Sequence, residues 1–224
     1  MSKSAELSRT REGTIINTLS KEQEYTCTQV VENVIAELQH NYQVDIVWKK
    51  TLMLKDVVNK LRQNNPDVNY NTTTDTSYIK PDGGLVYIKD NAGTLYPILI
   101  PEVKTQGTNK KRIAEGKKEQ SKGNAIERLG KNVIVVKEYL RNENINPFVC
   151  FGQGCDFCDG STILDRVVSI AGFHPINCVD MYGDTYGSFF FREEKWSIDE
   201  MQSIFLEIAT MSIEYYLQKY ADNF

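Results

Sequence analysis

Two neighbouring strand-like runs joined by a short turn constrain the fold of this chain more than any other feature. Leu85–Lys89 is rich in β-branched and aromatic residues, Asp90–Gly93 contains turn-forming residues, and Thr94–Lys104 is a second extended apolar run. Apolar runs separated in this way predict an antiparallel β-hairpin. We expect the rest of the chain to be organised around this hairpin.

Three charged side chains lie at the ends of the predicted hairpin. Glu102 and Lys104 project from one face of the second strand because side chains alternate across a strand, and the hairpin brings Asp82 back toward them. Two carboxylates suit Mg²⁺, and a neighbouring lysine can stabilise the charge that develops on a phosphodiester under attack. We interpret Asp82 and Glu102 as metal ligands and all three residues as catalytic. The alternative is an ordinary Pro-Asp-Gly-Gly turn beside a strand with exposed charges.

A basic segment follows the hairpin directly. Residues 104–122 contain seven Lys or Arg and two Glu, a net charge of +5, whereas the rest of the chain carries −9. Positive charge gathered beside two carboxylates is where a polyanion such as DNA would lie, so we predict a DNA-facing arm at about residues 105–122. A solvated charged loop is the alternative.

A helix is predicted after the basic segment. Its apolar positions are spaced to bury one face against the sheet, and they are Ile126, Leu129, Val133, Val136 and Leu140. Asn124 is expected at the N-cap with Glu127 three residues later, which is a variant capping box that would leave Arg128 as a surface residue. Alternatively, the helix start enters a DNA major groove, where Asn124 can pair with adenine and Arg128 can donate to bases or phosphate.

Three motifs in the same order resemble the EcoRI-type class II restriction endonucleases of the PD-(D/E)xK nuclease superfamily. The motifs are Lys-Pro-Asp-Gly-Gly at 80–84, Glu-Val-Lys at 102–104 and Gly-Asn-Ala-Ile-Glu-Arg at 123–128. The resemblance implies an α/β, restriction-endonuclease-like core, a mixed central sheet of about five strands flanked by helices, in a single domain. It also implies Mg²⁺-dependent cleavage of both strands of duplex DNA, leaving 5′-phosphates, and a cognate methyltransferase in the same system.

The resemblance assigns a set of DNA-contacting residues. In this family the helix start reads the inner bases of the site, AATT. This base-reading role carries over to Asn124, Glu127 and Arg128. The candidate DNA-binding residues are Ser121, Lys122, Asn124, Ala125, Glu127, Arg128 and Arg166. Asp165-Arg166 resembles a family pair whose arginine contacts DNA, and an ordinary surface arginine is the alternative for Arg166. A palindromic site read by one element per chain predicts a twofold homodimer.

Departures from the family pattern leave the full recognition site open. The basic segment is several residues shorter than the family arm, and Gln120-Ser121-Lys122 replaces the small and apolar residues that precede the Gly-Asn element. GAATTC is therefore the first choice, with bare AATT or another flank as the alternative. A DNA-binding protein that does not cleave, or a structure-specific or repair nuclease, are the rival functions.

The remaining sequence predicts one domain of ordinary composition. Of the 224 residues, 41% are hydrophobic and 25% charged, and no long apolar segment is present, so a soluble cytoplasmic protein is expected. Residues 1–24 are polar and expected to be partly ordered, and 25–224 are expected to form the single domain. The expected elements are a helix at 26–41, a strand at 42–48, a helix at 54–63, strands at 147–151 and 188–191, and a helix capped by Ser197 that buries Ile198, Met201, Phe205, Ile208 and Met211.

The five cysteines show no disulfide-framework spacing, which is consistent with a reducing compartment. Cys155 and Cys158 could form half of a zinc site, but only two histidines are available to complete one, and two free thiols in a loop are the alternative.

Overall fold

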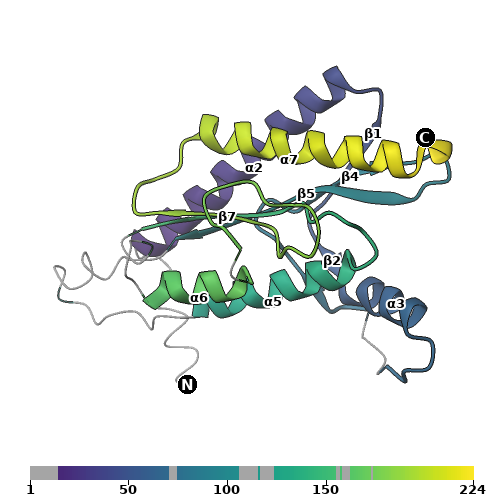
Figure 1. Cartoon of the computed structure of the whole chain (residues 1–224). Helices are drawn as coiled ribbons and strands as arrows, with labels where there is room; N and C mark the ends of the chain where they lie inside the picture. The colour runs from purple at the N-terminus through teal and green to yellow at the C-terminus, as the bar shows by residue number, and fades with distance from the viewer. Residues whose placement is uncertain are drawn as a thin grey trace.

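A five-stranded mixed sheet forms the centre of the computed structural model (Figure 1). The structure describes residues 15–70, 75–105, 116, 124–154, 157, 162–172 and 174–224. The strand order is β1-β4-β5-β6-β7. The bounds are Asp45–Lys49 for β1, Leu85–Lys89 for β4, Leu95–Thr105 for β5, Phe148–Gln153 for β6 and Ser188–Arg192 for β7.

Strand β5 joins two kinds of pairing within the sheet. Its first half, Leu95–Leu99, pairs with β4 in the antiparallel hairpin, and β4 also pairs with β1. Its second half, Ile100–Thr105, pairs in parallel with β6, which pairs in parallel with β7. The last residues of β5 therefore lie beyond the end of the β4 ladder.

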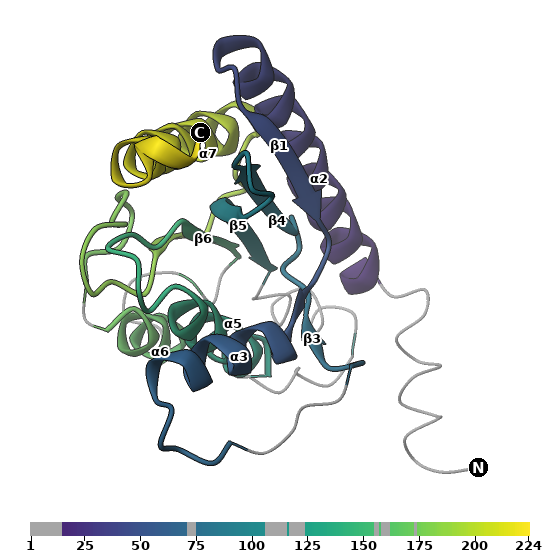
Figure 2. The same cartoon turned by 90° about the vertical axis from the view of Figure 1, so that its right-hand side faces the viewer.

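Helices cover both faces of the sheet. The long helices α2 (Ile15–Asn41) and α7 (Ile198–Lys219) pack together on one face, whereas α5 (Asn124–Tyr139) and α6 (Thr162–Ile170) lie on the other (Figure 1). Helix α3 (Leu54–Asn64) packs against α5, and α2 runs beside the edge strand β1 (Figure 2). A small sheet of β2 (Leu52–Met53) and β3 (Tyr78–Ile79) precedes the hairpin, and a short 3-10 helix, η2 (Ala221–Asn223), follows α7.

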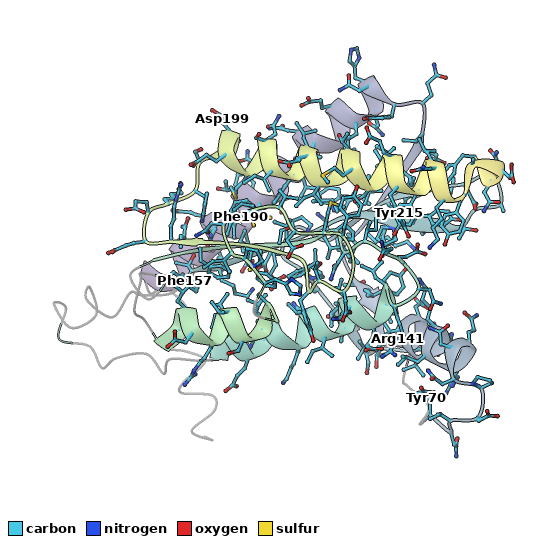
Figure 3. The ribbon with its side chains drawn as sticks, in the orientation of Figure 1. Tyr70, Arg141, Phe157, Phe190, Asp199 and Tyr215 are labelled. Atoms are coloured by element: carbon cyan, nitrogen blue, oxygen red, sulfur yellow. The ribbon has the colours of Figure 1, made fainter. Side chains whose placement is uncertain are left out.

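Alternation along β6 divides the core into two layers. Val149 and Phe151 pack with α2 and α7, while Phe148 and Cys150 pack with α5 and α6. The ring of Phe190 from β7 stacks on Phe151 with centroids 5.0 Å apart, between the sheet and the α2 and α7 layer (Figure 3). Each face of the sheet is thus sealed by its own hydrophobic cluster.

The β5-α5-β6 connection brings three element ends together. Parallel strands joined through a helix return the chain across the sheet, so the end of β5 and the beginning of α5 lie at one end of the molecule, at the left of Figure 1. The beginning of α2 lies there too, and Thr105 at the end of β5 donates a hydrogen bond from its hydroxyl to Gln23 Oε1.

Most predicted elements are confirmed, and some of their bounds differ. The hairpin, the parallel strand predicted at 147–151, which is β6, and the buried face of α5 agree with the structure, and Ser197 and Glu200 form the expected capping box of α7. Helix α2, however, begins at Ile15 rather than near residue 26, so the expected boundary at Glu24 falls inside a helix. Strand β1 begins at Asp45 rather than Tyr42.

Some observed elements were not expected. Helix α6 and the short strands β2 and β3 were not predicted from the sequence. Ile198 is 41% exposed rather than buried, at the first position of α7, whereas Met201 in the same turn is buried. Within the described residues, none of the helices combines the length and the apolar character needed to cross a membrane.

Candidate active site

A tight turn between β3 and β4 places Asp82 over β5. The turn is closed by Gly84 N, which donates to Pro81 O at 2.9 Å. Gly84 has a φ of 75°, and a Cβ at this residue would lie 2.6 Å from Lys49 O, so only glycine fits without strain. Gly83 N donates to Pro101 O at 3.0 Å and fastens the turn to β5. The Pro-Asp-Gly-Gly segment is therefore a turn, but one that delivers its carboxylate to the neighbouring strand.

Asp82, Glu102 and Lys104 form one connected group. Lys104 Nζ lies 3.3 Å from Asp82 Oδ2 and donates to Glu102 Oε1, so that the ammonium joins the two carboxylates. Backbone groups hold both acids: Val103 N donates to Asp82 Oδ2 and Asp82 N donates to Glu102 Oε2, each at 3.1 Å. The structure thus brings the three predicted catalytic side chains together.

Burial sets the electrostatics of this group. The side chains of Glu102, Lys104 and Asp82 are only 3%, 13% and 20% exposed. Burial raises the pKa of Glu102 above its usual range, although the Lys104 charge works in the opposite direction. Burial alone would lower the pKa of Lys104, but the carboxylates of Glu102 and Asp82 outweigh it and raise that pKa. Lys104 is therefore a fixed cation at neutral pH.

The two carboxylates have the donor chemistry for a hard divalent cation. Among the described residues, the hydrogen bonds to Asp82 reach only Oδ2, and Glu102 Oε2 accepts one bond, which leaves lone pairs on Asp82 Oδ1 and Glu102 Oε2. In the described part of the chain, no group of three or more Asp, Glu, His or Cys side chains gathers as a metal site. Two carboxylates completed by water and phosphate oxygens are a typical set for Mg²⁺, so the residues present fit this ion.

Two further hydrogen bonds support the three residues from other elements. Asn132 on α5 donates from Nδ2 to Glu102 Oε1 at 3.3 Å, and Trp48 on β1 donates from Nε1 to Gly83 O at 2.9 Å. Neither contact was predicted from the sequence. Asn132 lies four residues after Arg128, hence on the same helix face, which is the one signal that could have identified it.

Two buried thiols flank the group. Cys27 on α2 packs against Gly83, and Cys150 is the register partner of Glu102 on β6. Burial raises the pKa of both thiols, so they are neutral and pack as small apolar side chains. The possible zinc ligands Cys155 and Cys158 lie outside the described residues.

The structure describes only part of the predicted DNA-binding surface. Glu127 and Arg128 are exposed near the start of α5, and Arg166 is exposed on α6. Asn124 was predicted at the N-cap, but it is the first residue of α5 rather than the residue before the helix. The side chains of Asn124 and Ala125, and residues Ser121 and Lys122 with nearly all of the basic arm, lie outside the described part.

Comparison with known proteins gives a consistent set of matches. A family model described as restriction endonuclease EcoRI matches residues 9–170, a range that includes the hairpin, α5 and α6. The type II restriction enzyme RsrI of Cereibacter sphaeroides is 29% identical over 161 residues, and the type II restriction enzyme EcoRI of Escherichia coli is 28% identical over 161 residues. Each alignment covers 68% of this chain and 58% of the relative.

Proposed function

Because the chain belongs to the family of the restriction endonuclease EcoRI, we propose that it is a type II restriction endonuclease, a site-specific deoxyribonuclease. The observation that carries the proposal is the connected group of Asp82, Glu102 and Lys104 at the end of β5. Two carboxylates and a fixed cation suit hydrolysis of a phosphodiester, and the mixed sheet supplies the rigid frame that such a group needs.

We propose that Asp82 and Glu102 hold Mg²⁺ and that Lys104 acts on the reacting phosphate. Bound Mg²⁺ would polarise the phosphodiester and lower the pKa of a coordinated water. Water adds to phosphorus, the bond to the 3′ oxygen breaks, and the products carry a 5′-phosphate and a 3′-hydroxyl. Lys104, held charged by its two neighbours, stabilises the negative charge on the non-bridging oxygens and orients the attacking water.

Recognition is proposed to reside at the start of α5. Asn124, Ala125, Glu127 and Arg128 would read the inner AATT bases from the major groove. The exposure of Glu127 and Arg128 leaves them free to do so, while Ile126 and Leu129 anchor the helix in the core. Ser121, Lys122 and Arg166 would add contacts to DNA. GAATTC is the first choice of site.

The proposed assembly follows from the proposed site. A palindrome is cut in both strands most simply by a twofold homodimer in which each chain cleaves one strand. The basic segment at about 105–122 would track the DNA backbone. A methyltransferase of matching specificity would protect host DNA in the cytoplasm.

Digestion of a fully sequenced bacteriophage DNA tests the proposal. The purified protein is incubated with Mg²⁺ or with EDTA, and every DNA end is sequenced. Metal-dependent ends that share an AATT core are expected, and their neighbours identify the flanking bases. Glu102→Ala should keep DNA binding and lose cleavage. Intact DNA under all conditions would favour a binding protein, and ends without a shared sequence would favour a structure-specific nuclease.

A further inference from the structure

Helix α5 contacts the catalytic carboxylate directly through Asn132. Its Nδ2 donates to Glu102 Oε1 at 3.3 Å, and the same oxygen accepts from Lys104 Nζ. The other oxygen of Glu102 accepts from Asp82 N at 3.1 Å. Lys104 belongs to the hairpin that also carries Glu102, and Asp82 belongs to the turn that leads into it. Among the described residues, the hydrogen bond from Asn132 is the one that ties the Glu102 side chain to a helix.

The position of Asn132 on α5 links the Glu102 carboxylate to the start of the same helix. Leu129 and Val133, on either side of Asn132 along the helix, are buried, so α5 is packed firmly on the sheet here. Arg128 lies one turn earlier on the same face, and Asn124 lies about 12 Å along the helix axis at 1.5 Å per residue. One rigid helix thus carries the proposed base-reading residues at its start and a hydrogen bond to Glu102 in its middle.

We propose that Asn132 is a positioning residue that fixes the Glu102 carboxylate relative to α5 and so couples base recognition to cleavage. This inference rests on the proposed function. The amide occupies a lone pair of Oε1 and holds the carboxylate orientation in which Oε2 faces Asp82. A shift of α5 on a wrong sequence would be carried through this hydrogen bond to Glu102, and displacements of about 1 Å in a catalytic group can cost about 100-fold in rate.

Two variants of Asn132 test the positioning role. Asn132→Ala removes the side-chain amide, and Asn132→Leu removes it while keeping a similar volume. Loss of a partner that orients a metal ligand typically lowers metal affinity or activity by about 10- to 100-fold. Both variants should therefore show a single-turnover cleavage rate lower by about this factor, with DNA affinity in EDTA changed less than about twofold.

Asn142→Ala is the matched control. Asn142 is exposed three residues after the end of α5, and it donates to Asn64 Oδ1 at 2.9 Å. It directly follows Arg141, which Figure 3 labels. This variant should cleave like the wild type.

A measurement independent of cleavage separates a positioning role from a purely structural one. Mg²⁺ that binds only the folded state raises the melting temperature by mass action. In both Asn132 variants the Mg²⁺ concentration that gives half of this rise should increase about 10-fold or more, while the melting temperature in EDTA stays within a few degrees of the wild type. A lower melting temperature in EDTA with an unchanged Mg²⁺ response would show a structural role and overturn the proposal.

The coupling itself is tested with a double-mutant cycle. Arg128→Ala is combined with Asn132→Ala, and the cleavage rate of fully bound DNA is measured. If Asn132 carries the coupling, the rate loss caused by Arg128→Ala should shrink at least about fivefold in the Asn132→Ala background. If the rate loss of the double variant equals the product of the two single rate losses, the proposed coupling through Asn132 is refuted. A wild type that cuts no DNA would instead overturn the proposed function, while the Mg²⁺ titration would still test the positioning of Glu102.

Discussion

Removing the positive charge of Lys104 should lower the stability of the folded protein and also stop catalysis. In Lys104→Met, the buried Glu102 and the neighbouring Asp82 lose the cation that both contact. An uncompensated buried charge is costly because the surrounding protein solvates it poorly. We therefore expect the metal-free variant to be markedly less stable than the metal-free wild type.

The size of the loss follows from the burial of the three groups. Breaking a buried ion pair by removing one partner costs about 3–5 kcal/mol, and the 20% exposure of the Asp82 side chain favours the lower end, about 3 kcal/mol. For a domain of this size that corresponds to a decrease of about 6–12 °C in melting temperature. Because the loss of the cation would raise the pKa of Glu102 further, the folded variant would take up a proton as the pH falls, and the buried charge would be neutralised. The loss of stability relative to the wild type should therefore be larger at pH 8 than at pH 5.

Thermal unfolding in EDTA at the two pH values measures both effects. Lys89→Met is the matched control, since Lys89 pairs with Asp45 at an exposed position of the sheet and should contribute at most about 1 kcal/mol. Addition of Mg²⁺ should stabilise Lys104→Met more than it stabilises the wild type, because the ion replaces the missing positive charge. Equal melting temperatures for Lys104→Met and the wild type in EDTA at pH 8 would refute the reasoning.

Two further predictions concern the turn and a surface ion pair. Gly84→Ala places a Cβ 2.6 Å from Lys49 O at a φ of 75°, so it should lower the free energy of urea unfolding by about 2–4 kcal/mol and abolish cleavage. The control Gly93→Ala, with a φ of 86° and open space around it, should cost about 1 kcal/mol and leave cleavage intact. Similar losses of stability in both variants would contradict the steric argument. Hydrogen bonds from Arg192 lower the pKa of Glu200 to about 2, so this carboxylate stabilises the fold above its unfolded pKa of about 4.3, and the contribution is lost as the pH falls from about 5 to 2. Since the Glu200 side chain is 43% exposed and solvent screens its ion pair, Glu200→Gln should cost only about 1 kcal/mol at pH 7 and nothing near pH 2. A loss of stability that does not change with pH would contradict the linkage.

Local sequence was sufficient to predict the hairpin and the proximity of the three candidate catalytic residues, because these residues lie close together in the sequence. Asp82, Glu102 and Lys104 lie within one hairpin and its flanking turn, so alternation and turn chemistry bring them together without knowledge of the remaining fold. The contact from Asn132 depends on how α5 packs across the sheet. Periodicity shows which face of a helix is buried, but not which strand residue that face meets.

The errors in the predicted elements also have physical causes. The first part of α2 contains mostly polar residues, so its helical conformation from Ile15 leaves no apolar periodicity in the sequence. Helix α6 has only nine residues, which gives too few turns for a clear pattern. The candidate DNA-binding residues were assigned from family resemblance, and three of them, Glu127, Arg128 and Arg166, are exposed on α5 and α6.

The place that Asp82 takes beside β5 also protects the sheet from association with other chains. Beyond Leu99 the β4 side of β5 has no ladder partner among the described strands, and there the turn supplies the missing bonds, through Gly83 N to Pro101 O and Val103 N to Asp82 Oδ2. An unpaired strand edge is a template for aggregation. The Asp82 carboxylate accepts the amide hydrogen of Val103 and so removes that template. A substitution of Asp82 made to inactivate this site would therefore also expose an unpaired strand edge that can pair with another chain.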